Sequence, residues 1–133
     1  MYLLDTNVCI FLIKNKYPIL KQKILLCNPD EIFLSTVTLA EMEYGAFKSQ
    51  NIEKNRLAII DFCADFNQIL DFTAADTEAY GMIRAYLEKI GKIIGPYDMQ
   101  IAAQAMTHNL TVITNNYGEF SRIPWIKVED WTK

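Results

Sequence analysis

Four acidic residues are candidates for a shared catalytic or metal-binding site. They are Asp5, Glu41, Asp98 and Glu119. Carboxylates held close to one another either take up protons or bind a cation. Hard oxygen ligands, with water completing the shell, suit Mg²⁺ or Mn²⁺. Such a site activates a water molecule and grips a phosphodiester, so convergence of the four acids predicts a metal-dependent nuclease.

Each of these acids also has an ordinary structural interpretation. Asp5 is able to cap the first helix, and Glu41 completes a capping-box pattern with Thr38. Asp98 complements the dipole at the start of its helix, and Glu119 is an acid in a loop. Spacing alone therefore leaves both interpretations open.

A short strand places the first of the acids. Residues 2–4 form an apolar run without polar alternation, which is typical of a strand covered on both faces in a parallel sheet. In open α/β sheets, ligands bind in the crevice beyond the carboxyl ends of the strands. Asp5 is expected in that crevice, with Thr6 and Asn7 beside it.

The rest of the chain alternates between expected strands and helices. Further strands are expected at 32–35, 69–72, 110–114 and, at an edge, 126–128; helices are expected at 7–13, 18–26, 39–49, 52–65 and 73–90, with a last one opened by residues 95–98 and a loop at 115–119. This alternation predicts one α/β domain over residues 1–133, with a mostly parallel sheet of four to five strands flanked by helices.

Parallel-sheet geometry brings three of the four acids together. A residue that leaves the carboxyl end of a strand and one that enters the following helix lie at the same edge. Asp5, Glu41 and Glu119 meet this criterion. Asp98 begins the helix that runs into the strand at 110–114, so the same argument places it at the opposite edge.

Composition narrows the protein class only slightly. The net charge is −3, which does not predict a nucleic-acid binder, although a bound metal ion adds local positive charge. Three cysteines without C-x-x-C spacing argue against a disulfide framework and a zinc site. The opening run is too short for a signal peptide and residues 8–13 are too few to span a bilayer, so a cytoplasmic protein is expected.

Two other enzyme classes share part of the pattern. A haloacid-dehalogenase-type phosphatase also begins with an apolar strand and an aspartate, but it needs a second aspartate where this chain has Asn7. A dinucleotide-binding domain needs a glycine-rich first turn, which is missing.

Longer blocks of sequence resemble a known family. They are Leu3–Asn7, Ser35–Glu41 continuing to Tyr44-Gly45, Ile94–Asp98 continuing to Ile101-Ala102-Ala103, and Val112–Asn116 continuing to Glu119-Phe120. In order and spacing the chain resembles the PIN-domain ribonucleases, in particular the VapC toxins of bacterial toxin–antitoxin pairs. Glu129-Asp130-Trp131 also looks like a VapC C-terminus. Each block is weak alone, but together they are highly specific.

The resemblance implies roles for the acids. Asp5 and Asp98 hold Mg²⁺ or Mn²⁺ directly, and Glu41 binds the ion through water or orients the attacking water. It also implies that the matching helix brings Asp98 into the shared pocket. Many PIN domains have an aspartate where Asn116 stands, whereas VapC-like chains often have an acid at the position of Glu119.

We favour Glu119 as the fourth acid and Asn116 as a neutral pocket ligand. Thr6, Asn7 and Thr114 complete the expected pocket lining.

The resemblance also implies a substrate and partners. The typical substrate is a structured RNA, most often a tRNA anticodon stem-loop and sometimes ribosomal RNA, whose cleavage inhibits translation. This chain looks closest to the VapC group that cuts initiator tRNA. The usual partner is a VapB antitoxin whose C-terminal segment lies over the active site, in an assembly that contains a toxin homodimer. The alternative is a catalytically silent PIN domain that acts only as a binding partner.

Overall fold

A five-stranded sheet forms the centre of the protein. The computed structural model describes residues 1–133, and its strands are β1 (Tyr2–Leu4), β2 (Ile32–Ser35), β3 (Gln68–Leu70), β4 (Thr111–Ile113) and β5 (Lys127–Glu129). Their order is β3-β2-β1-β4-β5 and every neighbouring pair is parallel. The predicted α/β class is confirmed, and the sheet is entirely parallel with β5 at an edge.

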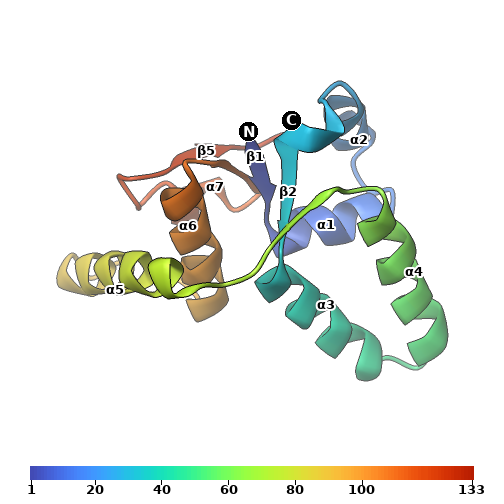
Figure 1. Cartoon of the computed structure of the whole chain (residues 1–133), viewed down its shortest axis with the longest axis horizontal. Helices are drawn as coiled ribbons and strands as arrows, with labels where there is room; N and C mark the ends of the chain where they lie inside the picture. Colours follow the sequence, from blue (N-terminus) through green and yellow to red (C-terminus); the bar gives the residue numbers. More distant parts are fainter.

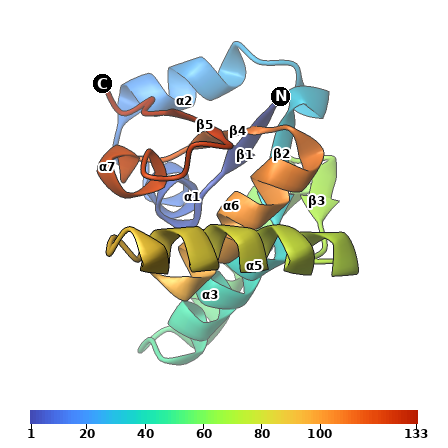
Figure 2. The ribbon, with the colours of Figure 1, turned by 90° about the vertical axis from the view of Figure 1, so that its left-hand side faces the viewer.

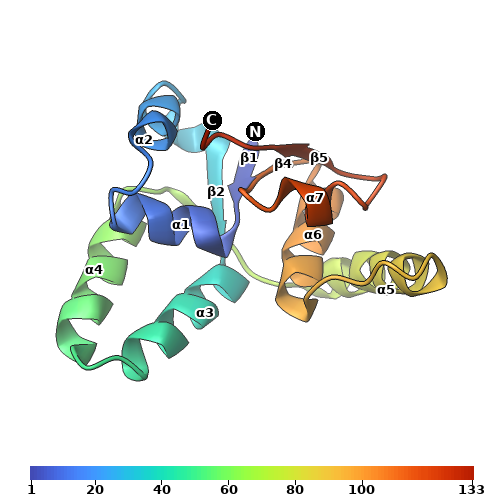
Figure 3. The same ribbon diagram turned by 180° about the vertical axis from the view of Figure 1, so that it is seen from behind.

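Seven α-helices cover the sheet. They are α1 (Thr6–Ile13), α2 (Pro18–Leu25), α3 (Thr36–Phe47), α4 (Ile52–Ala64), α5 (Ala74–Lys89), α6 (Pro96–His108) and α7 (Tyr117–Phe120), with a short 3₁₀ helix at Pro29–Glu31. Helices α1 to α4 lie on one side and α5 to α7 on the other (Figures 1 and 3). Helix α5 lies across α6 (Figure 2). None of the helices combines the length and apolar character needed to cross a bilayer.

The core is divided between the two faces of the sheet. In β1, Leu3 packs with α5 and α6 while Leu4 packs with α1 and α3, because successive side chains of a strand point to opposite faces. Val112 and Ile113 of β4 divide in the same way. This two-sided burial explains the apolar run that predicted the first strand.

The start of α3 differs from the prediction. Ser35 caps the helix, its hydroxyl accepting a hydrogen bond of 3.0 Å from the N–H of Val37. The predicted capping box between Thr38 and Glu41 is therefore wrong, since Thr38 lies inside the helix and its side chain is buried. Glu41 lies in the second turn. The sequence did not identify Ser35 as the helix cap, because the same residue also ends β2.

The region after β4 also differs from the prediction. Glu119 lies in the single helical turn of α7 rather than in an open loop. That turn is held by backbone hydrogen bonds from the N–H groups of Glu119 and Phe120 to the carbonyl of Asn116. The third strand is one residue earlier at its start than expected and ends at Leu70.

The placement of Asp98 at the far edge of the sheet is wrong for a simple geometric reason. Helix α6 runs antiparallel to the strands (Figure 1). Its 13 residues span about 20 Å at the helical rise, enough to cross the sheet. Its end leads into the start of β4, and its first turn, with Asp98, lies at the carboxyl edge.

Candidate active site

Asp5 lies at the carboxyl end of β1 with only 2% of its surface exposed. Its Oδ1 accepts a hydrogen bond of 2.9 Å from the N–H of Val8, so it caps α1. Its Oδ2 accepts a hydrogen bond of 2.5 Å from the hydroxyl of Thr114. The helix cap uses only Oδ1, so capping does not exclude the predicted role of Asp5 in the site.

Glu41 reaches the same edge from α3. The hydroxyl of Thr6 donates a hydrogen bond of 2.7 Å to Oε1 of Glu41 and lies 3.2 Å from the hydroxyl of Thr38. Because a hydroxyl both donates and accepts, Thr38 is able to donate to Thr6 while Thr6 donates to Glu41. The buried threonines orient a carboxylate that is itself half-buried.

The segment after β4 contributes the side chains of Thr114, Asn116 and Glu119 to the site. The Thr114 hydroxyl accepts a hydrogen bond of 2.9 Å from the N–H of Asn116. The Asn116 amide in turn donates a hydrogen bond of 2.8 Å to Oε2 of Glu119. Asn116 therefore positions Glu119, while its own carbonyl oxygen keeps its lone pairs for another partner.

Electrostatics show that the acids share one site. Burial raises the pKa of Asp5 to about 6, an effect opposed by the hydrogen bonds from Thr114 and Val8 and reinforced by the charges of Asp98 and Glu41. Burial also raises the pKa of Asp98 to about 6, with further contributions from Glu41 and Glu119.

We call Asp5, Glu41, Asp98 and Glu119 the acid cluster. The structure places all four predicted acids at one edge of the sheet. Their roles in catalysis and metal binding stay predictions.

The acid cluster does not form a ready-made cage. As placed, no three His, Cys, Asp or Glu side chains surround a common point closely enough to hold one ion. The donors are nevertheless all oxygen atoms, which is the set that Mg²⁺ and Mn²⁺ prefer. Asn7, predicted to line the pocket, is exposed and borders a groove beside the cluster.

Comparison with known proteins identifies the family of this chain. Residues 2–126 match the PIN domain family. The tRNA(fMet)-specific endonuclease VapC of Shigella flexneri is 42% identical over 131 residues, covering 98% of both chains. Ribonuclease VapC2 of Rickettsia felis is 41% identical, covering 100% of this chain and 99% of the relative. The chain belongs to the VapC family of PIN-domain proteins.

A solved VapC-family assembly shows the same fold. The crystal structure of VapBC2 from Rickettsia felis, bound to a DNA fragment from its promoter, contains a chain that superposes with a TM-score of 0.91 at 37% identity. The match covers 98% of each chain. Family membership thus agrees with the fold over nearly the whole length of the chain.

Among the buried polar residues of this VapC-family domain that sequence reasoning missed, Gln104 links two helices of the site. Gln104 of α6 is completely buried. Its Oε1 accepts a hydrogen bond from the hydroxyl of Ser35, and its Nε2 donates one of 3.2 Å to the carbonyl of Leu70. Since Ser35 caps α3, Gln104 joins the helix that carries Asp98 to the start of the one that carries Glu41. The sequence feature that points to Gln104 is its position among the alanines of α6, which are buried.

Replacing Gln104 by leucine is expected to destabilise the domain by about 1–3 kcal/mol, because the change leaves the buried Ser35 hydroxyl without its acceptor. Urea unfolding followed by circular dichroism measures this loss. Gln22→Leu is the matched control, since Gln22 is exposed on α2 and should change stability by less than about 0.5 kcal/mol. Equal stability of the two variants would show that the Gln104 hydrogen bonds contribute little.

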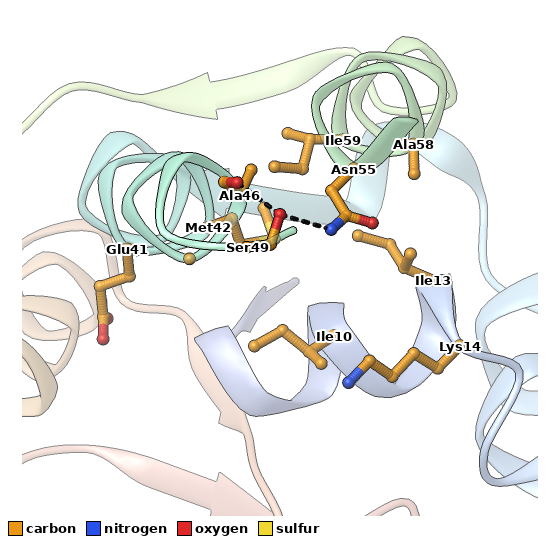
Figure 4. Close-up of a pocket in the computed structure, with 11 residues that line it drawn as sticks. Ile10, Ile13, Lys14, Glu41, Met42, Ala46, Ser49, Asn55, Ala58 and Ile59 are labelled. Carbon is orange, nitrogen blue, oxygen red and sulfur yellow. Dashed lines mark hydrogen bonds between the residues drawn. The ribbon is translucent and has the colours of Figure 1, made fainter. Parts of the chain in front are cut away.

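Two hollows of the VapC-family domain border α3. One has a volume of about 330 Å³ and lies between α1, α3 and α4, with apolar side chains such as Ile10, Ile13 and Ile59 in its wall (Figure 4). A hydrogen bond of 2.8 Å from Asn55 to Ser49 spans part of its wall. Of the acid cluster only Glu41 borders this hollow, and in Figure 4 it points away from α4. The second hollow is the groove beside the acid cluster.

Proposed function

We propose that this chain is a metal-dependent endoribonuclease and the toxin of a VapB–VapC pair. It cuts a structured RNA by attack of water on a phosphodiester and so inhibits translation. The observation that carries the proposal is the convergence of the acid cluster at one edge of the sheet, where Thr6 holds Glu41, Thr114 holds Asp5 and Asn116 holds Glu119. The charges of Glu41 and Asp98 act on Asp5, and those of Glu41 and Glu119 act on Asp98, so the four carboxylates lie near one another.

A divalent cation fits the donor set of the site. Asp5 and Asp98 would hold Mg²⁺ or Mn²⁺, since both are carboxylates whose negative charge is disfavoured by burial and by their acidic neighbours. When bound, the ion favours deprotonation of water and offsets the charge that develops on the phosphate.

The protein groups have separate tasks in the reaction. The N–H of Val8 and the hydroxyl of Thr114 hold the two oxygens of Asp5 in fixed directions. Thr6 holds one oxygen of Glu41, so the other is available to accept a hydrogen bond from the attacking water and orient it. Asn116 holds Glu119 at the rim of the site.

A tRNA is the substrate we propose, with initiator tRNA as the specific target and the anticodon stem-loop as the cut region. This is supported by the full-length 42% identity to a protein named for its action on tRNA(fMet). The proposed place of action is the cytoplasm, where translation takes place.

A VapB-type antitoxin is the proposed protein partner. The support is the likeness to VapC chains solved as VapBC complexes, among them DNA-bound VapBC from Salmonella typhimurium with a TM-score of 0.91. We propose that toxin chains pair as homodimers within a larger toxin–antitoxin assembly.

The test is incubation of the purified, antitoxin-free protein with total bacterial RNA, in Mg²⁺ or in EDTA, followed by sequencing of the new RNA ends. We expect one dominant cut in a tRNA, present with Mg²⁺ and absent with EDTA. A folded protein that leaves all RNA intact with Mg²⁺ would instead support a PIN domain that only binds.

A further inference from the structure

The groove beside the acid cluster lies between α1, α3 and α6. Its volume is about 930 Å³, within the range of pockets that hold small organic molecules. Thr6 and Glu41 line the groove and are hydrogen-bonded to each other in the site. A group bound in the groove therefore lies next to the carboxylate of Glu41.

Two tyrosines line this groove and keep much of their surface exposed. Tyr44 of α3 is 67% exposed, and Tyr97 of α6 is 55% exposed. Tyr97 directly precedes Asp98, and Tyr44 lies one turn after Glu41 on the same helix. Exposed aromatic rings of this kind are the surfaces on which proteins stack unpaired bases.

Lys48 supplies the only positive charge in the lining of the groove. Its ammonium lies 4.8 Å from the centre of the Tyr44 ring, and neither of the two ion pairs of the chain involves it. Lysines without a carboxylate partner are available for phosphate contacts. Glu41, Tyr44 and Lys48 stand at i, i+3 and i+7, so they form one stripe along α3 and its C-cap residue, Lys48.

We propose that this groove holds the unpaired RNA nucleotides next to the bond that is cut. Tyr44 and Tyr97 stack on bases, and Lys48 contacts a backbone phosphate. The proposal rests on the proposed function, because it names the part of that same site that grips the RNA. Since only bases free of pairing partners are open to stacking, the groove favours RNA that is single-stranded at the cut.

Fluorescence anisotropy with a short fluorescein-labelled RNA single strand tests the tyrosines. The parent protein is Asp98→Asn, so that the probe is not cut. Tyr44→Ala and Tyr97→Ala are each expected to weaken binding about tenfold, the loss typical of one base stack. Tyr97→Phe keeps the ring and should bind like the parent. The same strand annealed to its complement should not distinguish the variants.

Salt dependence tests Lys48. Lys48→Ala is expected to reduce the slope of log Kd against log salt concentration by about 0.7, the value for one phosphate contact on a single strand. Lys16→Ala is the charge control, because the Lys16 ammonium also lies over an aromatic ring, 5.2 Å from the centre of Phe11. Phe47→Ala is the ring control, since Phe47 is 56% exposed on the same helix but outside the groove.

The outcomes separate this inference from the proposed function. Equal binding by the parent, Tyr44→Ala and Tyr97→Ala would overturn the groove assignment. If the groove variants bind the RNA strand normally but lose binding to a VapB-type peptide, the groove holds the protein partner instead. That result would also overturn the assignment of the groove to RNA. If wild-type protein cuts RNA while the groove variants bind normally, only the groove assignment fails. If wild-type protein neither binds nor cuts RNA, the proposed function fails as well.

Discussion

Asp98→Asn is expected to abolish RNA cleavage and the growth arrest caused by expression of the wild-type protein. The change keeps the size and shape of the side chain but removes a charge from the proposed metal site. We expect the rate of cleavage to fall by at least about a hundredfold, because losing even an outer partner of a metal ligand costs 10- to 100-fold. Single-turnover cleavage of a labelled tRNA in Mg²⁺ measures the effect.

Asp61→Asn is the matched control for this experiment. Asp61 lies on α4, is exposed, and makes no side-chain hydrogen bond or ion pair with the protein, so the same chemical change there removes charge without touching the acid cluster. We expect normal cleavage and normal growth arrest from it. Unchanged growth arrest from a folded Asp98→Asn protein would show that Asp98 is not part of the metal site.

The metal-free protein is expected to lose stability relative to Asp98→Asn as the pH rises from about 4 to about 7. Burial and neighbouring acids raise the pKa of Asp5 and Asp98 from 3.8 to about 6. Between these values the folded protein binds more protons than the unfolded chain, so the free energy of unfolding falls with pH. Asp5 is present in both proteins, so the difference between them comes from Asp98. A shift from 3.8 to about 6 corresponds to about 3 kcal/mol for a fully buried group, and the effect for half-buried Asp98 is smaller because solvent screens the charge.

Thermal melting of both proteins in EDTA across this pH range measures the difference. Below about pH 4 the two melting temperatures should agree, because the aspartate is protonated in both the folded and the unfolded state. Near pH 7, Asp98→Asn should melt higher by several degrees. A wild-type protein that is the more stable of the two at pH 7 without metal would mean that Asp98 is stabilised by a partner rather than repelled by acids.

The sequence predicted best those features that depend on neighbouring residues. The apolar run before Asp5 identified β1, because a central parallel strand is buried on both faces and so shows no polar alternation. Residues 95–98 were expected to open a helix, and α6 begins at Pro96, a residue that suits a first turn because it lacks a backbone N–H. Local rules of this kind need no knowledge of the rest of the chain.

Features that depend on distant residues were harder to predict. The error over Asp98 came from treating the start of a helix as if it lay near the strand that follows, although a helix of that length crosses the whole sheet. Gln104 was missed because its partners, Ser35 and Leu70, are 69 and 34 residues away in the chain. The family resemblance corrected the first error, but it did not identify Gln104.

Binding of Mn²⁺ to the metal-free protein tests the central claim most directly. Isothermal titration calorimetry near pH 7.5 should show saturable binding to the wild-type protein and to Asp61→Asn, with binding lost in Asp98→Asn. Such a result would show that the acids, which do not surround an ion as they are placed here, converge on one when it is supplied. Equally tight binding by Asp98→Asn, or no saturable binding by folded wild-type protein, would contradict the claim that the acid cluster is a metal site.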